Sequence, residues 1–302
     1  MKILMTGGTG FIGSFLTDKF IRDGHEVSIL IRKEIDIKKK SRNITFINGA
    51  PTVSGPWQHL VNNYDVIINL TGASIFSRWT GEQKKLIKET RINSTRNIVD
   101  ALDANLSKAV TLFNASAVGY YGFHGDEELT EEAPPGNDFL ATVAKEWEKE
   151  ALEAKKKGVR VCIMRFGIVL GTDGGIIGRM IPLFKNFLGG PIGNGKQWFS
   201  WVHADDLTEA FSFLLKHPEL SGPFNVCSPV PVRNKGLVKA IGKALKRPSL
   251  MPLPGFIIRL VLGEFGCVIL KGQKVLPRRL IENGFIFKHQ NIDDAIAAII
   301  TN

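Results

Sequence analysis

Three glycines near the N-terminus have the spacing of a phosphate-binding turn. Gly7, Gly10 and Gly13 stand in the segment TGGTGFIG at 6–13, between an apolar run and an amphipathic run. Glycines so spaced permit a tight turn, a close approach of the backbone to a pyrophosphate and close packing of a helix on a strand. The segment predicts a dinucleotide site, and a turn with only a structural role is the alternative. The residues that we expect to contact the dinucleotide are Gly7, Thr9, Gly10, Phe11, Ile12 and Gly13.

A basic residue ends the second predicted strand. Arg32 stands about 20 residues after the glycines, where an NAD site usually places an acidic residue on the ribose hydroxyls. A guanidinium can instead bind a 2′-phosphate through two hydrogen bonds. The sequence therefore predicts NADP rather than NAD as the cofactor, and an exposed arginine on a solvated turn is the alternative.

These residues need a sheet to hold them, and the hydropathy pattern predicts one. Apolar runs, read as strands, alternate with amphipathic helices. The strands are expected at 2–7, 27–32, 43–48, 65–72, 110–116 and 159–167, and the helices at 11–23, 80–104 and 138–157. Strands that are apolar throughout indicate a parallel sheet covered on both faces. We expect an α/β fold, a doubly wound parallel (Rossmann) sheet with a smaller C-terminal substrate lobe.

The composition of the chain changes after about residue 168, where glycines and prolines cluster. We predict an NADP-binding domain at 1–168, to which 198–225 returns, and a substrate-binding lobe made of 169–197 and 226–302. The longest apolar stretch, 256–270, contains Arg259 and Glu264 and is too short to span a membrane. We expect it to form a core helix of the lobe, with a surface for a partner or a membrane as the alternative.

Composition narrows the classes of partner. The 302 residues are 44% hydrophobic and carry a net charge of +10, which admits nucleic acid, an anionic membrane or acidic small molecules. The basic residues are dispersed apart from runs at 38–40 and 155–157, and no nucleic-acid motif accompanies them, so a small-molecule substrate is favoured. Three distant cysteines predict neither a disulfide framework nor a metal site. A cytoplasmic location fits the cysteines and the strand at the N-terminus.

Five segments resemble a known family. They are TGGTGFIG (6–13), NLTG (69–72), SAVGYYG (116–122), RFGIVLG (165–171) and GNGKQWFSWVHADDL (193–207). Together they resemble the extended short-chain dehydrogenase/reductases of the NAD-dependent epimerase/dehydratase superfamily. The resemblance implies that Leu70, Thr71 and Gly72 contact the cofactor. By analogy with extended relatives, it also implies a homodimer.

A closer resemblance is to an atypical branch of epimerase-family proteins. RWTGEQKKLIKETRINST, the WE at 147–148, GGPIGNGKQWFSWVH and LPRRLIENGF carry it. The branch keeps the glycine motif, lacks the usual active-site set and has no assigned substrate, and some relatives carry a cell-division label. In ordinary members a tyrosine and a lysine four residues apart move a proton and bind the ribose. Here Lys145 is preceded by Ala141, and Phe139 has no ionisable proton.

The resemblance also implies other losses. It puts Arg91 in the position of an active-site asparagine, Phe199 in that of a phosphate-binding arginine, His203 in that of a tyrosine, and Ile168 in that of a frequent asparagine. Each loss weakens the case for a UDP- or dTDP-sugar substrate.

Three hydroxyls are the catalytic candidates. By the resemblance, Ser116 ends the fifth strand near the reacting carbonyl, and Tyr120 or Tyr121 could donate a proton; the alternative is that these rings only pack. Glu148 is expected to brace its helix. The carboxylates of 125–132 are expected in a solvated loop.

Three basic side chains are the substrate candidates. Arg78 beside Trp79 could bind an anionic or flat substrate, joined by Arg91, and ion pairs with Glu82 or Glu89 are the alternative. His203 with Asp205 resembles a proton relay. A cap by Asp205 or Asp206 on a helix from about 206, with His203 between the lobes, is favoured over that relay.

Two functions remain open. The leading one is an NADP-dependent oxidoreductase or epimerase-like enzyme on an unknown small molecule, with a non-standard proton donor. The alternative is a catalytically silent NADP(H)-sensing regulatory or scaffold protein that binds partners through 256–270. Slow NADPH oxidation with a carbonyl compound supports the enzyme, and tight binding without turnover supports the sensor.

Overall fold

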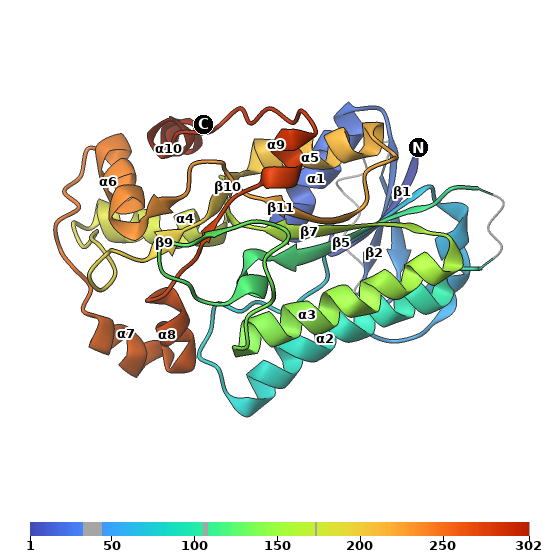
Figure 1. Cartoon of the computed structure of the whole chain (residues 1–302), viewed down its shortest axis with the longest axis horizontal. Coiled ribbons are helices and arrows are strands. Elements are labelled where there is room, and N and C mark those ends of the chain that lie inside the picture. The colour runs from blue at the N-terminus through green and yellow to red at the C-terminus, as the bar shows by residue number, and fades with distance from the viewer. Residues whose placement is uncertain (33–43, 105–107, 173, 302) are drawn as a thin grey trace.

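A seven-stranded parallel sheet forms the centre of the molecule (Figure 1). The computed structural model describes residues 1–32, 44–104, 108–172 and 174–301. The strand order is β11-β7-β5-β4-β1-β2-β3, and every neighbouring pair is parallel. The strands are β1 (Lys2–Thr6), β2 (Glu26–Ile31), β3 (Ile44–Asn48), β4 (Val66–Asn69), β5 (Thr111–Ala117), β7 (Arg160–Phe166) and β11 (Gly222–Val226). The predicted doubly wound α/β fold is confirmed.

Helices cover both faces of this sheet. On one face lie α1 (Phe11–Arg22) and α5 (Ala204–Lys216), and on the other lie α2 (Gly81–Ala101) and α3 (Phe139–Leu152) (Figure 1). Successive residues of β1 belong to the two different cores, because side chains alternate along a strand. Ile3 packs with Leu16 of α1, whereas Leu4 packs with Ile98 of α2. Strands buried on both faces need apolar residues at every position, which is the pattern that the sequence shows.

Short elements build the C-terminal part. Its strand pairs are β8 (Ile168–Leu170) with β10 (Trp201–His203) and β9 (Trp198–Phe199) with β12 (Val232–Arg233), and its β13 (Lys274–Val275) pairs with β6 (Glu128–Leu129) of the preceding part. Its helices are α4 (Gly175–Lys185), α6 (Asn234–Leu245), α7 (Gly255–Leu262), α8 (Glu264–Ile269), α9 (Arg278–Glu282) and α10 (Ile292–Thr301). The remaining elements are the 3-10 helices η2 (Pro56–Asn63), η3 (Val118–Tyr121) and η4 (Glu153–Lys157). α4, α6 and α10 enclose a third apolar core. Of the segment 198–225, β11 joins the main sheet beside β7; the proposed domain boundaries remain a prediction.

The apolar stretch 256–270 does not form one core helix. It divides into α7 and α8 at Gly263, whose φ of 61° favours glycine. α7 buries only Ile258, while Phe256 and Leu260 are 72% and 75% exposed. The expectation of a buried helix is therefore wrong for α7. Apolar composition favours burial, but burial also needs another element that packs over the helix. Among the described residues, no helix has the length and apolar character to cross a bilayer.

One of the two lysine runs has a structural role. Lys157 in η4 donates hydrogen bonds to the carbonyls of Val99, Asp100 and Leu102, at the C-terminal end of α2. A cation there satisfies carbonyl groups that the helix leaves unpaired. The other run, 38–40, lies outside the described residues.

Candidate functional site

The direction of strand order changes at β1. β2 and β3 lie on one side of β1, and β4, β5, β7 and β11 lie on the other. Ligands of open α/β sheets bind at such a switch point, beyond the carboxyl ends of the strands. The paired residues Thr6 and Asn69 end β1 and β4 there, and the N–H of Leu70 donates to the Thr6 carbonyl at 3.1 Å. The glycine turn and the residues 70–72 therefore meet at one place, and their contacts with a cofactor remain a prediction.

The turn after β1 has room only for glycine at two positions. Gly7 has a φ of 71°, which side chains rarely permit, and its carbonyl accepts the N–H of Gly10 at 3.0 Å. A Cβ on Gly13 would lie 2.3 Å from the Gly7 carbonyl oxygen. A Cβ on Gly7 would touch the Leu70 carbonyl at 3.0 Å. The turn thus packs α1 directly against the ends of β1 and β4.

The N-terminus of α1 presents free donors. Its N-cap, Gly10, has no side-chain cap, and the first N–H bonded within the helix is that of Ser14, which donates to the Gly10 carbonyl at 2.8 Å. Within the described part of the chain, the N–H groups of Phe11 and Ile12 have no acceptor. Free N–H groups and the helix dipole make this end an anion site.

A cavity and an unpartnered hydroxyl accompany these donors. The cavity holds about 420 Å³. Its lining residues are Thr9, Gly10, Phe11, Ser14, Phe15, Asp18 and Thr172. The hydroxyl of Thr71 is buried and has no hydrogen-bond partner among the described residues. A glycine cradle, free donors and an orphaned hydroxyl at one switch point fit the pyrophosphate of a dinucleotide. Arg32 is exposed and directly follows β2, which is the place predicted for a contact with a 2′-phosphate.

The helix α3 carries no lysine toward the sheet. Lys145 is exposed, whereas Ala141, Ala144 and Glu148 are buried against the sheet. Phe139 packs edge-on against Trp79, with the ring centres 5.1 Å apart. A tyrosine–lysine pair is therefore absent from this helix in space as well as in sequence.

Two of the three catalytic candidates belong to a buried polar network. The hydroxyl of Ser116 donates to Glu148 Oε1 at 2.6 Å, and Glu148 binds Arg165 through two bonds of 2.8 Å. The hydroxyl of Tyr121 donates to Asn225 Oδ1 at 2.6 Å and accepts from Arg165 Nη1 at 2.9 Å. Burial raises the pKa of Tyr121 above its usual range. Both hydroxyls are held by these bonds, which suits a bracing role.

Tyr120 is placed differently. Its side chain is half-buried, and the Arg165 guanidinium carbon lies 3.6 Å from its ring centre. Within the described part of the chain its hydroxyl makes no hydrogen bond. Of the three candidates, Tyr120 has the hydroxyl that a substrate could reach. The catalytic assignment of Ser116, Tyr120 and Tyr121 remains a prediction.

The loop 125–132 is not solvated throughout. Asp126, Glu127, Glu128 and Glu132 are exposed, as expected, but Glu131 is buried. Its carboxylate accepts the backbone N–H of Asn225 at 2.9 Å, and burial raises its pKa. The expectation of a solvated loop is wrong at Glu131, because this backbone donor comes from a strand distant in sequence.

The predicted substrate residues do not form one cluster. Arg78 is exposed beside Gly263, and among the described residues neither Arg78 nor Arg91 pairs with Glu82 or Glu89. Trp79 is buried, and its indole N–H donates to the Ile75 carbonyl at 3.0 Å. Its ring is therefore not open for stacking on a substrate, which corrects that part of the prediction.

Arg91 lies against the end of β4. Its Nη1 donates to the carbonyls of Ala73 at 3.1 Å and Ile87 at 2.8 Å, and its guanidinium packs on Gly72. Burial lowers its pKa to about 10. Among the described residues it has no acidic partner.

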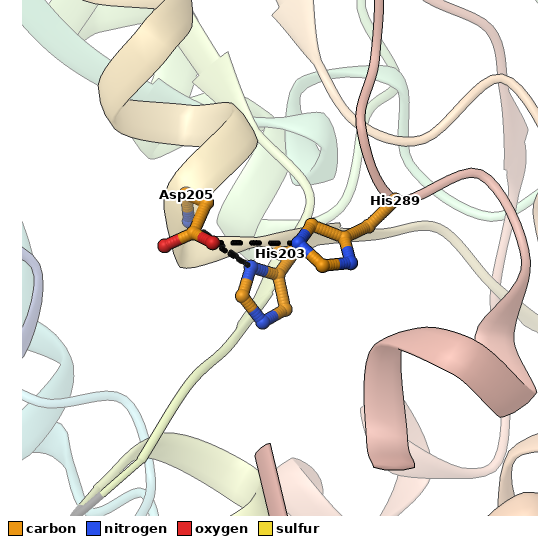
Figure 2. A group of neighbouring side chains, drawn as sticks. All are labelled: His203, Asp205 and His289. Carbon is orange, nitrogen blue, oxygen red and sulfur yellow. Dashed lines mark hydrogen bonds and ion pairs between the residues drawn. The ribbon is translucent and has the colours of Figure 1, made fainter. Parts of the chain in front are cut away.

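His203 is the N-cap of α5 (Figure 2). Its Nδ1 accepts the N–H of Asp205 at 3.1 Å, and its ring stacks on His289 with centres 3.9 Å apart. Burial, followed by the charge of His289, lowers the pKa of His203 to about 4. Asp206 instead accepts the backbone N–H groups of Lys288 and His289 at 2.7 and 2.9 Å. The expectation that Asp205 or Asp206 caps this helix is wrong, because His203 provides the cap and Asp206 binds the C-terminal segment.

His203, Asp205 and His289 also have metal-ligating atoms within 4.8 Å of one another. The Asp205 carboxylate is 3.3 Å from His289 Nε2 (Figure 2). It is also 3.4 Å from Lys288 Nζ. The lone pair of His203 Nδ1 already accepts the N–H of Asp205 in the helix cap. The ammonium group of Lys288 also lies beside the Asp205 oxygen that faces His289. These contacts describe a junction between α5 and the segment before α10.

The family comparisons agree with this geometry. Residues 3–227 match the family "NAD dependent epimerase/dehydratase family", and residues 253–299 match a domain of unknown function. An Arabidopsis thaliana protein, "Epimerase family protein SDR39U1 homolog, chloroplastic", is 41% identical over 99% of this chain and 87% of its own length. Epimerase family protein YfhF of Bacillus subtilis is 39% identical over 100% of this chain and 99% of its own.

Solved structures of other proteins are similar to this chain over its whole fold. Human epimerase family protein SDR39U1, crystallised with NADPH, is 29% identical, with a TM-score of 0.87 over 100% of both chains. A Bacillus cereus UDP-glucuronic acid 4-epimerase in complex with NAD has a TM-score of 0.80 at 16% identity, which shows the fold alone. With its glycine turn at the switch point and without the tyrosine–lysine pair, the chain belongs to the NAD dependent epimerase/dehydratase family, as an atypical extended short-chain dehydrogenase/reductase among the proteins named epimerase family proteins.

Proposed function

We propose that this protein binds NADP and is an oxidoreductase or epimerase-like enzyme on a small molecule, with a proton donor other than the usual tyrosine. The observation that carries the proposal is the uncapped N-terminus of α1 at the switch point, with Arg32 at the end of the neighbouring strand β2. The human relative that was crystallised with NADPH supports the choice of cofactor.

Different residues bind different parts of the cofactor in this proposal. The N–H groups of Phe11 and Ile12 hold the pyrophosphate, Arg32 binds the 2′-phosphate, and residues 70–72 line the space beyond β4. When bound, the reduced cofactor supplies a hydride. NADP is favoured over NAD because the Arg32 guanidinium can donate two hydrogen bonds to the 2′-phosphate, a group that NAD lacks.

Tyr120 is the proton donor in this proposal. The phenol gives its proton to the oxygen of a substrate carbonyl while the carbonyl carbon accepts the hydride, so that an alcohol forms. The half-buried hydroxyl can regain a proton from solvent. Ser116 and Tyr121 position this region through the Arg165–Glu148 pair, since their own hydroxyls are bonded within the network.

A panel of carbonyl compounds tests the activity. NADPH oxidation, followed by absorbance, is expected with at least one aldehyde, ketone or keto acid. Tyr120→Phe is expected to lower kcat by about 100-fold or more, and to leave NADPH affinity within about threefold, because removing a general acid acts on the chemical step. Tight NADPH binding with no turnover on any compound would contradict the enzyme and support a cofactor-sensing protein.

A further inference from the structure

The site contains a cation that the glycine turn does not explain. Arg91 stands in the middle of α2, and its guanidinium turns back onto the residues that follow β4. A Cβ on Gly72 would lie 2.8 Å from the guanidinium carbon, so the guanidinium rests on the Gly72 backbone. Gly72 is two residues beyond Leu70, which touches the glycine turn at Gly7. Arg91 therefore borders the same switch point as the N-terminus of α1.

The charge of Arg91 is not balanced by the protein. In the part of the chain that the structure describes, no carboxylate lies within ion-pair distance, and the contacts are two carbonyl oxygens and the Trp147 ring at 5.3 Å. Arg96, five residues further along α2, donates two hydrogen bonds to the Glu150 carboxylate at 2.9 and 3.0 Å. A partly buried charge without a counter-ion is unfavourable unless a ligand supplies one.

Further free donors belong to the elements that meet at this switch point. The buried Thr71 hydroxyl has no partner among the described residues, and the α1 N–H groups are free. Nε and Nη2 of Arg91 have no acceptor in that part of the chain. Free donors thus belong to α1, to the β4 exit and to α2, and an anion is the group that satisfies donors of this kind.

The strand order indicates which anion to expect between α1 and Arg91. β1 lies between β2 and β4, so Arg32 and Arg91 stand on opposite sides of the glycine turn. With the 2′-phosphate at Arg32, the dinucleotide crosses the turn toward β4. Its remaining anionic group, the pyrophosphate, is then placed between α1 and Arg91.

We propose that Arg91 is a second anchor of the cofactor, binding the nicotinamide-side phosphate of the pyrophosphate opposite the N-terminus of α1. This inference rests on the proposed NADP site. It assigns Arg91 to the cofactor, where the sequence placed it with the substrate.

Binding measurements separate the two halves of the cofactor. NADPH and 2′,5′-ADP, which lacks the nicotinamide-side phosphate, are titrated by calorimetry into the wild-type protein, Arg91→Gln, Arg91→Met and the control Arg96→Gln. Arg91→Gln and Arg91→Met are expected to weaken NADPH binding by about 10- to 100-fold, the effect of losing a charge-assisted hydrogen bond. Their affinity for 2′,5′-ADP is expected to stay within about threefold of wild type, and Arg96→Gln to change neither ligand by more than about twofold.

The variants are checked by circular dichroism and thermal unfolding before titration. Methionine keeps an apolar side chain over Gly72, so Arg91→Met carries the test if glutamine impairs folding. Wild-type affinity for NADPH in a folded Arg91 variant would overturn the inference, as would an equal loss for both ligands. Failure of the wild-type protein to bind NADPH would instead contradict the proposed function, which keeps the two failures distinct.

Discussion

The Arg165 guanidinium carbon lies over the Tyr120 ring, 3.6 Å from its centre, and the same guanidinium donates two hydrogen bonds to Glu148. Arg165 and Glu148 are 3% and 6% exposed, so this is a buried ion pair. The pair fixes the ring that we propose as the proton donor, and through Ser116 it also ties α3 to the end of β5.

The first prediction concerns the stability of this pair. Glu148→Gln leaves the Arg165 charge buried without a counter-ion, so the free energy of unfolding is expected to fall by about 3–5 kcal/mol. Urea unfolding followed by circular dichroism measures it. Glu146→Gln is the matched control, since Glu146 stands on α3 like Glu148 but forms a surface ion pair with Lys88 of α2. Its loss is expected to change stability by less than about 1 kcal/mol. Equal effects of the two changes would contradict a stabilising network.

The second prediction concerns the glycine turn. Gly13→Ala places a Cβ 2.3 Å from the Gly7 carbonyl oxygen, which only a backbone shift can relieve. The affinity for NADPH is expected to fall by about tenfold or more, with a loss of roughly 1–3 kcal/mol in stability, because overpacking forces the backbone to move. Gly81→Ala is the control, since a Cβ added there, at the start of α2, would meet no heavy atom within 4 Å. NADPH affinity unchanged in Gly13→Ala would count against a cofactor held by this turn.

The third prediction concerns pH. The pKa of His203 is about 4 in the folded protein and about 6.5 when unfolded. Between these values the unfolded chain binds the proton and the folded chain does not, so His203 makes the protein less stable as the pH falls from about 6.5 to about 4. The full loss is roughly 3 kcal/mol.

A matched variant isolates this effect. Asparagine is a good N-cap, so His203→Asn keeps a cap on α5 and removes the titrating group. Thermal unfolding from about pH 7 to about pH 4 is expected to show a smaller drop in Tm for His203→Asn than for the wild-type protein. Parallel curves for the two proteins would remove His203 from the account of acid sensitivity.

The sequence predicts those features that depend on local pattern. The order of strands and helices follows from alternating apolar runs, and the glycine turn follows from spacing, since both are set by residues close together in the chain. The lost tyrosine–lysine pair can also be read directly, because α3 has one face toward the sheet and Lys145 is on the other.

Features that depend on distant contacts could not be predicted in this way. Glu131 stands in an acidic loop, and its burial depends on the backbone of Asn225, 94 residues away. Asp206 has the composition of a helix cap, yet the C-terminal segment at Lys288 takes its carboxylate. No local signal marks either pairing. The exposure of α7 could not be predicted either. Its apolar composition predicts burial, whereas its actual exposure depends on whether another element packs over it.

The central claim is a dinucleotide on α1 with its 2′-phosphate at Arg32, and one comparison tests it most directly. NADPH and NADH are titrated into the wild-type protein and Arg32→Gln at the same ionic strength. The account predicts that the wild-type protein binds NADPH at least about tenfold more tightly than NADH, and that Arg32→Gln loses most of this preference, as expected for a charge-assisted bond to phosphate. Equal or tighter binding of NADH by the wild-type protein, or no uptake of either nucleotide at millimolar concentrations, would contradict it.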